Sequence, residues 1–116
     1  MSYVDAFVLA VERDRIDEYT RFAEEMSRAW LEHGATAYVQ CVGEDTPFGE
    51  LTSFPRAVEA KQNEVVVLAW ISYPSKAVRD EVHAKLTADP ALQPPFDTGR
   101  MFWGAFRPII SLGKGV

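Results

Sequence analysis

The chain has 116 residues, nearly half of them apolar and a quarter charged, which is the balance of an ordinary globular protein. Its length predicts one domain spanning residues 1–116. The formal net charge is −5 and the 12 Lys and Arg residues are scattered singly, so we expect no nucleic-acid partner. The chain has neither the start of a secretory signal nor an apolar run near the roughly 18 residues of a membrane span. We therefore expect a cytoplasmic protein with no membrane partner.

The first third of the chain predicts a strand, a helix and a second strand. Residues 3–11 are rich in β-branched and aromatic residues and contain no Gly or Pro, which favours a strand. Apolar residues then recur at spacings of three and four from 16 to 30, which is typical of one helix face. We expect Asp14 to cap this helix and Gly34 to end it in a left-handed conformation. Residues 35–42 form the predicted second strand.

Residues 43–63 predict a long irregular connection, because Pro47, Gly49 and Pro55 interrupt any periodic pattern. Phe48, Leu51 and Phe54 would be costly to leave in water. We therefore expect this segment to be ordered and to fold back onto the body of the protein or onto a partner.

The rest of the chain predicts a strand, a helix and a strand. Residues 64–73 form an almost continuous apolar run that Pro74 ends. Ser75 is a natural N-cap for a helix that Asp89-Pro90 closes, and residues 101–110 supply a final strand. The resulting order, βαββαβ, predicts an α+β fold with a four-stranded antiparallel sheet.

Both faces of this sheet are expected to be apolar, because alternation divides each strand into two sets with few charges. We assign the smaller, aliphatic set to the helices: Val4, Ala6, Val8, Ala37, Val39, Cys41, Val65, Val67, Ala69, Ile71, Phe102 and Phe106. The opposite set is more aromatic: Tyr3, Asp5, Phe7, Leu9, Tyr38, Gln40, Glu64, Val66, Leu68, Trp70, Ser72, Met101, Trp103 and Arg107. Left bare, that second surface would be a large apolar patch, so we expect a homodimer through the sheet faces, a ligand, or both.

Four segments carry a resemblance to a known family: Tyr3 to Val8, Trp30 to Gly43, Thr52 to Val58, and Glu64 to Ser75. In them the chain resembles the YbaA-like family of small uncharacterised bacterial proteins. This resemblance implies a ferredoxin-like fold of the dimeric α+β barrel superfamily, in which two protomers pack their sheets into one barrel. It implies no activity.

The candidate ligand-binding residues are those polar and aromatic groups that share the predicted barrel-facing surface: Asp5, Tyr38, Gln40, Trp70, Trp103 and Arg107. Aromatic walls with a few converging polar groups are typical of a small-molecule pocket and also of a dimer interface, and of the two we favour the interface. Asp5 and Arg107 lie on neighbouring strands and could pair, either as part of a site or as a structural ion pair. Arg56, which follows Phe54-Pro55, could clamp a ligand carboxylate or pair within the protein.

Neither histidine has a clear role. His33 at a helix end favours a structural interpretation. Superfamily relatives that break down haem use an Asn, a Trp and a His on equivalent elements, and Asp5, Trp70 and His83 loosely resemble that set. We expect no cofactor. We also expect no metal, because two distant histidines and the single Cys41 do not have the spacing of metal ligands.

Two functions remain open from the sequence. One is binding of a small organic molecule, with a cofactor-independent oxidoreductase or isomerase activity, in a barrel cavity of at least ~300 Å³ lined by Asp5, Trp70 and Trp103. The alternative is a non-enzymatic homodimeric interaction or structural protein, in which residues 43–63 embrace the partner.

Overall fold

The two long strands β1 (Tyr3–Glu12) and β3 (Glu64–Tyr73) form the centre of the sheet in the computed structural model, which describes residues 2–114. They pair antiparallel along their whole length, from Tyr3 opposite Tyr73 to Glu12 opposite Glu64. The shorter strands β2 (Ala37–Val42) and β4 (Phe102–Phe106) lie at the edges, giving the order β2-β3-β1-β4. The βαββαβ order and antiparallel pairing confirm the predicted ferredoxin-like α+β fold.

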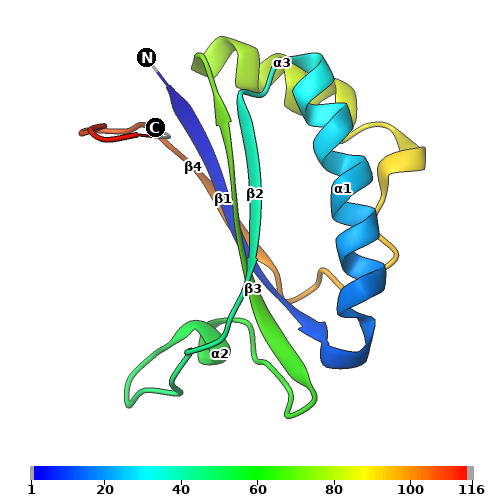
Figure 1. Ribbon diagram of the computed structural model, residues 1–116, viewed down its shortest axis with the longest axis vertical. Helices are drawn as coiled ribbons and strands as arrows, with labels where there is room; N and C mark the ends of the chain where they lie inside the picture. Colours follow the sequence, from blue (N-terminus) through cyan, green and yellow to red (C-terminus); the bar gives the residue numbers. More distant parts are fainter. Residues whose placement is uncertain (1, 115–116) are drawn as a thin grey trace.

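Two helices, α1 (Ile16–His33) and α3 (Lys76–Leu86), cover one face of the sheet (Figure 1). The predicted cap at Asp14 is wrong, because Asp14 lies inside the 3-10 turn η1 (Arg13–Arg15) and α1 begins after Arg15. Gly34 ends α1 at a φ of +130°, as predicted, and a Cβ there would lie 2.9 Å from Val78 Cγ1. Ser75 caps α3 by accepting a hydrogen bond from the Val78 backbone N–H at 3.2 Å, which confirms that prediction. No helix within residues 2–114 has the length and apolarity needed to cross a membrane.

The connection from β2 to β3 folds back onto the sheet, as expected, but through a residue that the sequence did not single out. It contains a short helix, α2 (Phe54–Ala57), followed by the fully buried Val58. Val58 packs on Val8, Ala10 and Val66. The three predicted anchors, Phe48, Leu51 and Phe54, are exposed instead. The segment therefore covers only one end of the sheet face opposite to α1 and α3 (Figure 1).

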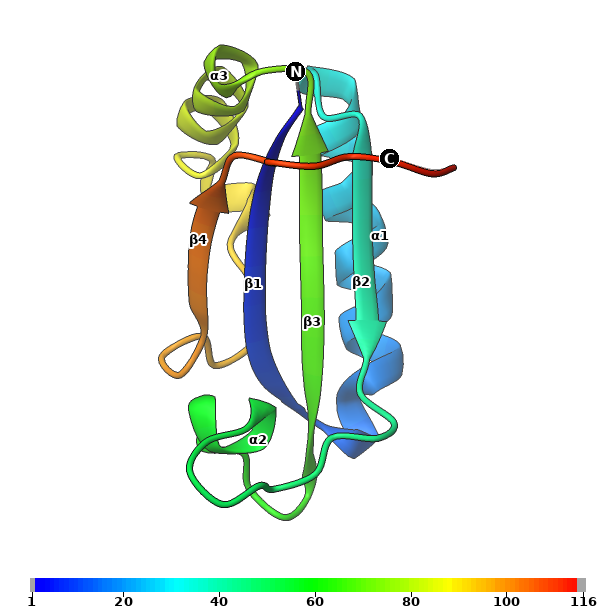
Figure 2. The same cartoon turned by 90° about the vertical axis from the view of Figure 1, so that its left-hand side faces the viewer.

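The last strand is shorter than predicted, because β4 ends at Phe106 rather than Ile110. A second 3-10 turn, η2 (Pro90–Leu92), lies in the connection from α3. After β4, the chain crosses in front of β1, β3 and β2 on the face that carries no helix (Figure 2). Ile109, Ile110 and Leu112 in this crossing segment are exposed.

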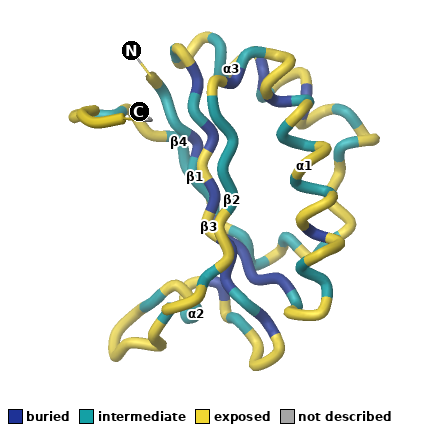
Figure 3. The backbone as a smooth tube through the Cα atoms, in the orientation of Figure 1, coloured by how far each residue is buried: buried dark blue, intermediate teal, exposed yellow. Residues whose placement is uncertain are grey.

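The assignment of sheet faces is correct for β3 and wrong for β1, β2 and β4. Leu9 and Val11 pack with Tyr19 of α1 and with Val67, so the odd-numbered residues of β1 face the helices. Val8 and Ala10 face the other way, toward Val58. The register then assigns Tyr38, Gln40 and Trp103 to the helix side, and Val39, Cys41, Phe102 and Phe106 to the open side. Figure 3 shows the buried residues concentrated along the central strands between these two surfaces.

The physical reason for this error is that the helix layer does not close tightly onto the sheet. We assigned small aliphatic residues to the helix side because a close-packed layer favours them. Instead, Asp5 and the larger side chains of Phe7, Tyr38 and Trp103 lie there and form walls of a cavity.

Candidate functional site

A cavity of about 230 Å³ lies between the sheet and the two helices. Its walls come from β1, β2, β3, β4, α1, α3 and the 87–101 connection, and they are mostly apolar. Aromatic side chains make up much of the lining: Phe7, Tyr19, Phe22, Trp30, Tyr38, Phe96 and Trp103. Asp5 and His83 are the ionisable groups that stand out in this wall. An apolar cleft with a few converging polar groups is the usual form of a small-molecule site.

Asp5 is the centre of a buried polar network beside this cavity, with only 4% of its surface exposed. Its Oδ2 accepts a hydrogen bond from the Tyr73 hydroxyl at 2.8 Å, and its Oδ1 accepts one from Arg79 Nε at 3.0 Å. The Tyr73 hydroxyl accepts in turn from Trp30 Nε1 at 3.1 Å. His83 Nε2 lies 3.5 Å from Asp5 Oδ2. The charge of Asp5 is therefore balanced by Arg79 and shared with two neutral neighbours.

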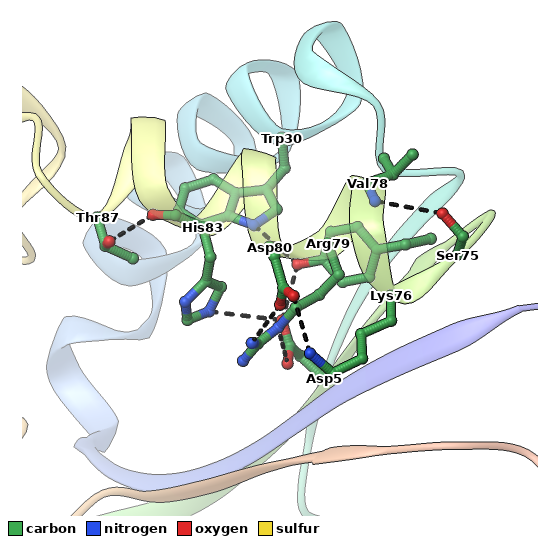
Figure 4. Close-up of polar contacts among 10 residues, drawn as sticks. Asp5, Trp30, Ser75, Lys76, Val78, Arg79, Asp80, His83 and Thr87 are labelled. Atoms are coloured by element: carbon green, nitrogen blue, oxygen red, sulfur yellow. Dashed lines mark hydrogen bonds and ion pairs between the residues drawn. The ribbon is translucent and has the colours of Figure 1, made fainter.

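The local fold explains how these groups meet. Asp5 lies opposite Ile71 near one end of the β1–β3 pair, and Tyr73 is the last residue of β3. The capped start of α3 follows at once, so Arg79 and His83, four residues apart, lie on the same face of that helix. Figure 4 shows both side chains pointing from α3 toward Asp5.

His83 contributes a titratable imidazole to the cavity wall. Burial is the main cause that lowers the pKa of His83 from its usual value, and the nearby positive charge of Arg79 lowers it further. Asp5 and Asp80 oppose that shift only in part. The imidazole is thus neutral at neutral pH, and it lines the cavity with Trp103, whose ring centroid lies 5.8 Å away.

A second polar group lies in the cavity wall on the β2 side. Gln40 accepts a hydrogen bond from the Tyr19 hydroxyl, and its Nε2 donates to the Tyr38 hydroxyl at 3.0 Å. Burial raises the pKa of both tyrosines, so both hydroxyls stay protonated. These three side chains give the cavity an uncharged polar end, in contrast with the charged cluster around Asp5.

Four of the seven predicted site residues line the cavity: Asp5, Tyr38, Gln40 and Trp103. Trp70 pairs with Ala6 and lies on the open face, so it does not belong to this group. Trp70 therefore lies on the other side of the sheet from Asp5 and His83. The three residues do not come together, so their likeness to the residues of the haem-degrading relatives is lost. The cavity is smaller than the ~300 Å³ we expected and lies on the helix side of the sheet, not inside a barrel.

The two remaining arginines have other partners. The predicted pairing of Asp5 with Arg107 is wrong, because Arg79 is the arginine that pairs with Asp5, and Arg107 is exposed beyond the end of β4. Arg56 donates to the carbonyl oxygens of Phe48 and Gly49, at 2.8 and 3.0 Å, and its guanidinium lies over the Phe48 ring. Arg56 therefore holds its own loop together.

Sequence reasoning missed Arg79, Tyr73 and Trp30. The spacing of Arg79 and His83 was a usable signal, because residues four apart share a helix face. Nothing in the sequence paired Trp30 with Tyr73, which lie 43 positions apart. Within residues 2–114, no group of three or more His, Cys, Asp or Glu residues is arranged to hold a metal ion.

The fold and the pocket together define a ferredoxin-like α+β protein with a cavity under its helices. Solved structures support the fold. A dimeric ferredoxin-like protein from an uncultured marine organism matches with a TM-score of 0.59 at 7% identity, covering 96% of this chain and 98% of that one. Rv0793 from Mycobacterium tuberculosis matches with a TM-score of 0.56 at 11% identity, covering 97% and 100%. At these identities the likeness shows the fold alone.

The sequence comparisons are more specific. Residues 2–102 match the model of a family described as "Protein of unknown function (DUF1428)". The chain is 44% identical over 115 residues to the uncharacterised protein YbaA of Escherichia coli K12, covering 95% of this chain and 98% of YbaA. YbaA of Shigella flexneri matches to the same extent. The chain therefore belongs to the DUF1428 family, which confirms the resemblance seen in its sequence.

Proposed function

We propose that this protein binds a small organic molecule in the cavity between the sheet and the helices, and that His83 exchanges a proton with it. One observation carries the proposal: a buried charged cluster, Asp5 with Arg79 and Tyr73, borders an otherwise apolar cavity and has a neutral imidazole beside it. Perturbed ionisable groups at a cleft are the usual sign of a functional site.

The size and lining of the cavity favour a ligand of about one substituted ring. An apolar cavity of roughly 150 Å³ is enough for benzene, so about 230 Å³ leaves room for one ring with polar substituents. Phe7, Phe22 and Phe96 offer apolar ring contacts. A hydroxyl or carbonyl at one end of the ligand would meet His83, and one at the other end would meet Gln40.

The chemistry that these side chains supply is proton transfer. The neutral imidazole of His83 would accept a proton from a ligand O–H, or from a C–H next to a carbonyl, and return it to another atom of the same ligand. Such an isomerisation conserves protons and electrons. Asp5, 3.5 Å from His83 Nε2, would stabilise the transient imidazolium.

A fragment screen tests the binding step. We expect single-ring fragments that carry a hydroxyl or carbonyl to raise the thermal midpoint of the wild-type protein. Gln40→Leu should lower the affinity for the best fragment about tenfold, because it removes one polar end of the cavity. Trp70→Phe, on the open face, is the matched control and should bind normally. Equal binding by wild-type protein and Gln40→Leu would contradict this position for the ligand.

Solvent exchange tests the proton transfer separately. Incubated in D₂O, a bound carbon acid should exchange its acidic hydrogen for deuterium faster with wild-type protein than with His83→Gln, as measured by NMR. The two proteins should bind the ligand with similar affinity, because Gln keeps the size and polarity of the side chain. Equal exchange rates would exclude His83 as the base and leave only the binding proposal.

The open face of the sheet supports a second proposal, a homodimer that pairs through this face. Four large apolar side chains are exposed there: Leu68, Trp70, Phe102 and Phe106. Monomers seldom leave such a contiguous patch in water. One of the solved structures with this fold is described as dimeric, which is in line with a homodimer.

Light scattering after size exclusion tests the dimer with a matched pair of variants. Trp70→Glu introduces a charge on the open face and should give a monomer. Trp103→Glu introduces the same charge on the helix side of the sheet and should leave the dimer intact. A dimer that survives Trp70→Glu would contradict pairing through this face.

We also infer one domain over residues 1–116 and a cytoplasmic location. Cys41 is exposed and forms no disulfide, which suits a reducing compartment. Cell fractionation with an antibody against the native protein tests the location, and recovery outside the cytoplasm would contradict it.

A further inference from the structure

Two exposed segments project from the open face at opposite ends of the sheet. We call residues 44–51 the knob and residues 107–114 the tail. Figure 1 shows the knob at the α2 end of the sheet and the tail at the other end, both on the side away from α1 and α3. Figure 2 shows the tail passing in front of the strands, so the face between the two segments is framed at both ends.

Both segments expose apolar side chains that their own protomer does not cover. Leu51 in the knob is 96% exposed and Ile109 in the tail is 87% exposed. Exposure of this degree is costly for a leucine or isoleucine and is common at sites where another protein docks.

The two segments carry opposite charges. The knob contains Glu44, Asp45 and Glu50 and no basic residue, whereas the tail contains Arg107 and Lys114 and no acidic residue. All five side chains are exposed, and none of them is among the ion pairs found within residues 2–114. The charges are therefore available to an outside partner.

The knob also has a preformed shape. Arg56 closes it by donating to two carbonyl oxygens, and its guanidinium lies 3.6 Å from the centroid of the Phe48 ring. Ser53 caps the short helix that follows by accepting from the Arg56 N–H. A segment that is already ordered loses little conformational entropy when it docks.

We propose that the partner is a second copy of this chain, turned so that the acidic knob of each protomer lies against the basic tail of the other. This inference rests on the homodimer proposed above and adds its orientation. A twofold axis in the plane between two facing sheets can bring like ends together, with knob against knob, or unlike ends, with knob against tail. Like ends would set three carboxylates against three carboxylates, whereas unlike ends pair opposite charges at two equivalent places.

Cysteine cross-linking distinguishes the two orientations. In a Cys41→Ser background, Leu51→Cys and Ile110→Cys chains carrying tags of different mass are mixed and oxidised. A disulfide needs Cα atoms within about 7 Å, so a short bis-maleimide is used in parallel to allow some slack. We expect cross-linked heterodimers in the mixture and none from either variant alone.

The other outcomes each contradict a defined part of the proposal. Cross-linking of Leu51→Cys alone or Ile110→Cys alone would show that like ends meet, and a dimer without any cross-link would also overturn the knob-to-tail contact. In both cases the dimer itself would stand. A monomer by light scattering, with all variants folded, would overturn the dimer and its orientation together.

A charge-reversal pair tests the same contact without cysteines. Glu50→Lys and Arg107→Glu should each raise the dimer dissociation constant about fivefold, because each sets like charges together at the rim. The double variant should return to within about twofold of wild type. Glu25→Lys, on the exposed surface of α1, is the control and should change nothing. If the double variant instead showed the summed loss of dimer affinity of the two single variants, the pairing of knob and tail would be contradicted.

Discussion

Among residues 2–114, two buried carboxylate–arginine pairs lie one on each side of the sheet. On the open side, under the β2–β3 connection, Glu64 binds Arg100 through two hydrogen bonds of 2.8 and 2.7 Å and accepts a third from the Lys61 N–H. Arg100 also donates to the carbonyl oxygens of Val58 and Glu59. On the helix side, Asp5 pairs with Arg79 beside a cavity and within 3.5 Å of His83.

The difference between the pairs is what surrounds them. Backbone groups of the protein complete the Glu64–Arg100 pair and hold the connection against the sheet, so this pair is structural. In the Asp5–Arg79 pair, Asp5 lies in the cavity wall beside the titratable ring of His83, which lines the same cavity. The same type of ion pair thus anchors the fold on one side and borders the proposed ligand site on the other.

Asp5→Asn should cost the most, about 3 kcal/mol of unfolding free energy, because it removes the buried counterion of Arg79 and leaves only the exposed Asp80 beside it. Urea denaturation measures this loss. Asp80→Asn, which removes the exposed carboxylate next to Arg79, should cost much less. Similar losses for the two variants would show that Asp5 does not balance Arg79.

Glu64→Gln should change the acid stability. The hydrogen bond from Arg100 is the main cause that lowers the pKa of Glu64 from 4.5 to about 2. Because the folded-state pKa is the lower one, this stabilisation is present above pH 4.5 and is lost as the pH falls toward 2. Between those pH values the wild-type protein should lose about 2 kcal/mol more than Glu64→Gln. Parallel acid unfolding curves would contradict this role of Glu64.

Arg79→Gln should raise the pKa of His83 relative to the wild-type protein. Burial, the larger cause of the lowered pKa, is retained in this variant, but the opposing charge of Arg79 is removed while Asp5 remains. Histidine ring signals in an NMR titration measure the change, and His33 serves as the internal reference. A fall in the pKa of His83 would show that Arg79 does not act on it directly.

Lys76→Gln should have no measurable effect on stability, although Lys76 and Asp80 lie 2.8 Å apart. Both side chains are exposed, and water screens such a pair. Urea denaturation with the same midpoint as wild type is expected. A clearly lower urea midpoint for Lys76→Gln would mean that distance alone, rather than burial, sets the strength of these ion pairs.

The strands and their order could be predicted from the sequence, because residues 3–11 and 64–73 are long, apolar and free of Gly and Pro. The faces of the sheet could not be assigned, because β1 is almost entirely apolar on both sides and Asp5 alone does not show which side the helices cover. Asp5 was found because a lone carboxylate in such a strand is conspicuous. Its partner was misassigned to Arg107, since neighbouring strands suggested that pairing, whereas the start of α3 brings Arg79 closer.

The separate roles of the two sheet faces can be tested by NMR through the indole N–H groups of the three tryptophans. Trp30 and Trp103 line the cavity, and Trp70 lies on the open face. We expect the best fragment to shift the Trp30 and Trp103 signals and leave Trp70 unchanged, and dilution of the dimer to shift Trp70 alone. A fragment that moves Trp70 and leaves the other two in place would contradict the assignment of the ligand site to the helix side of the sheet.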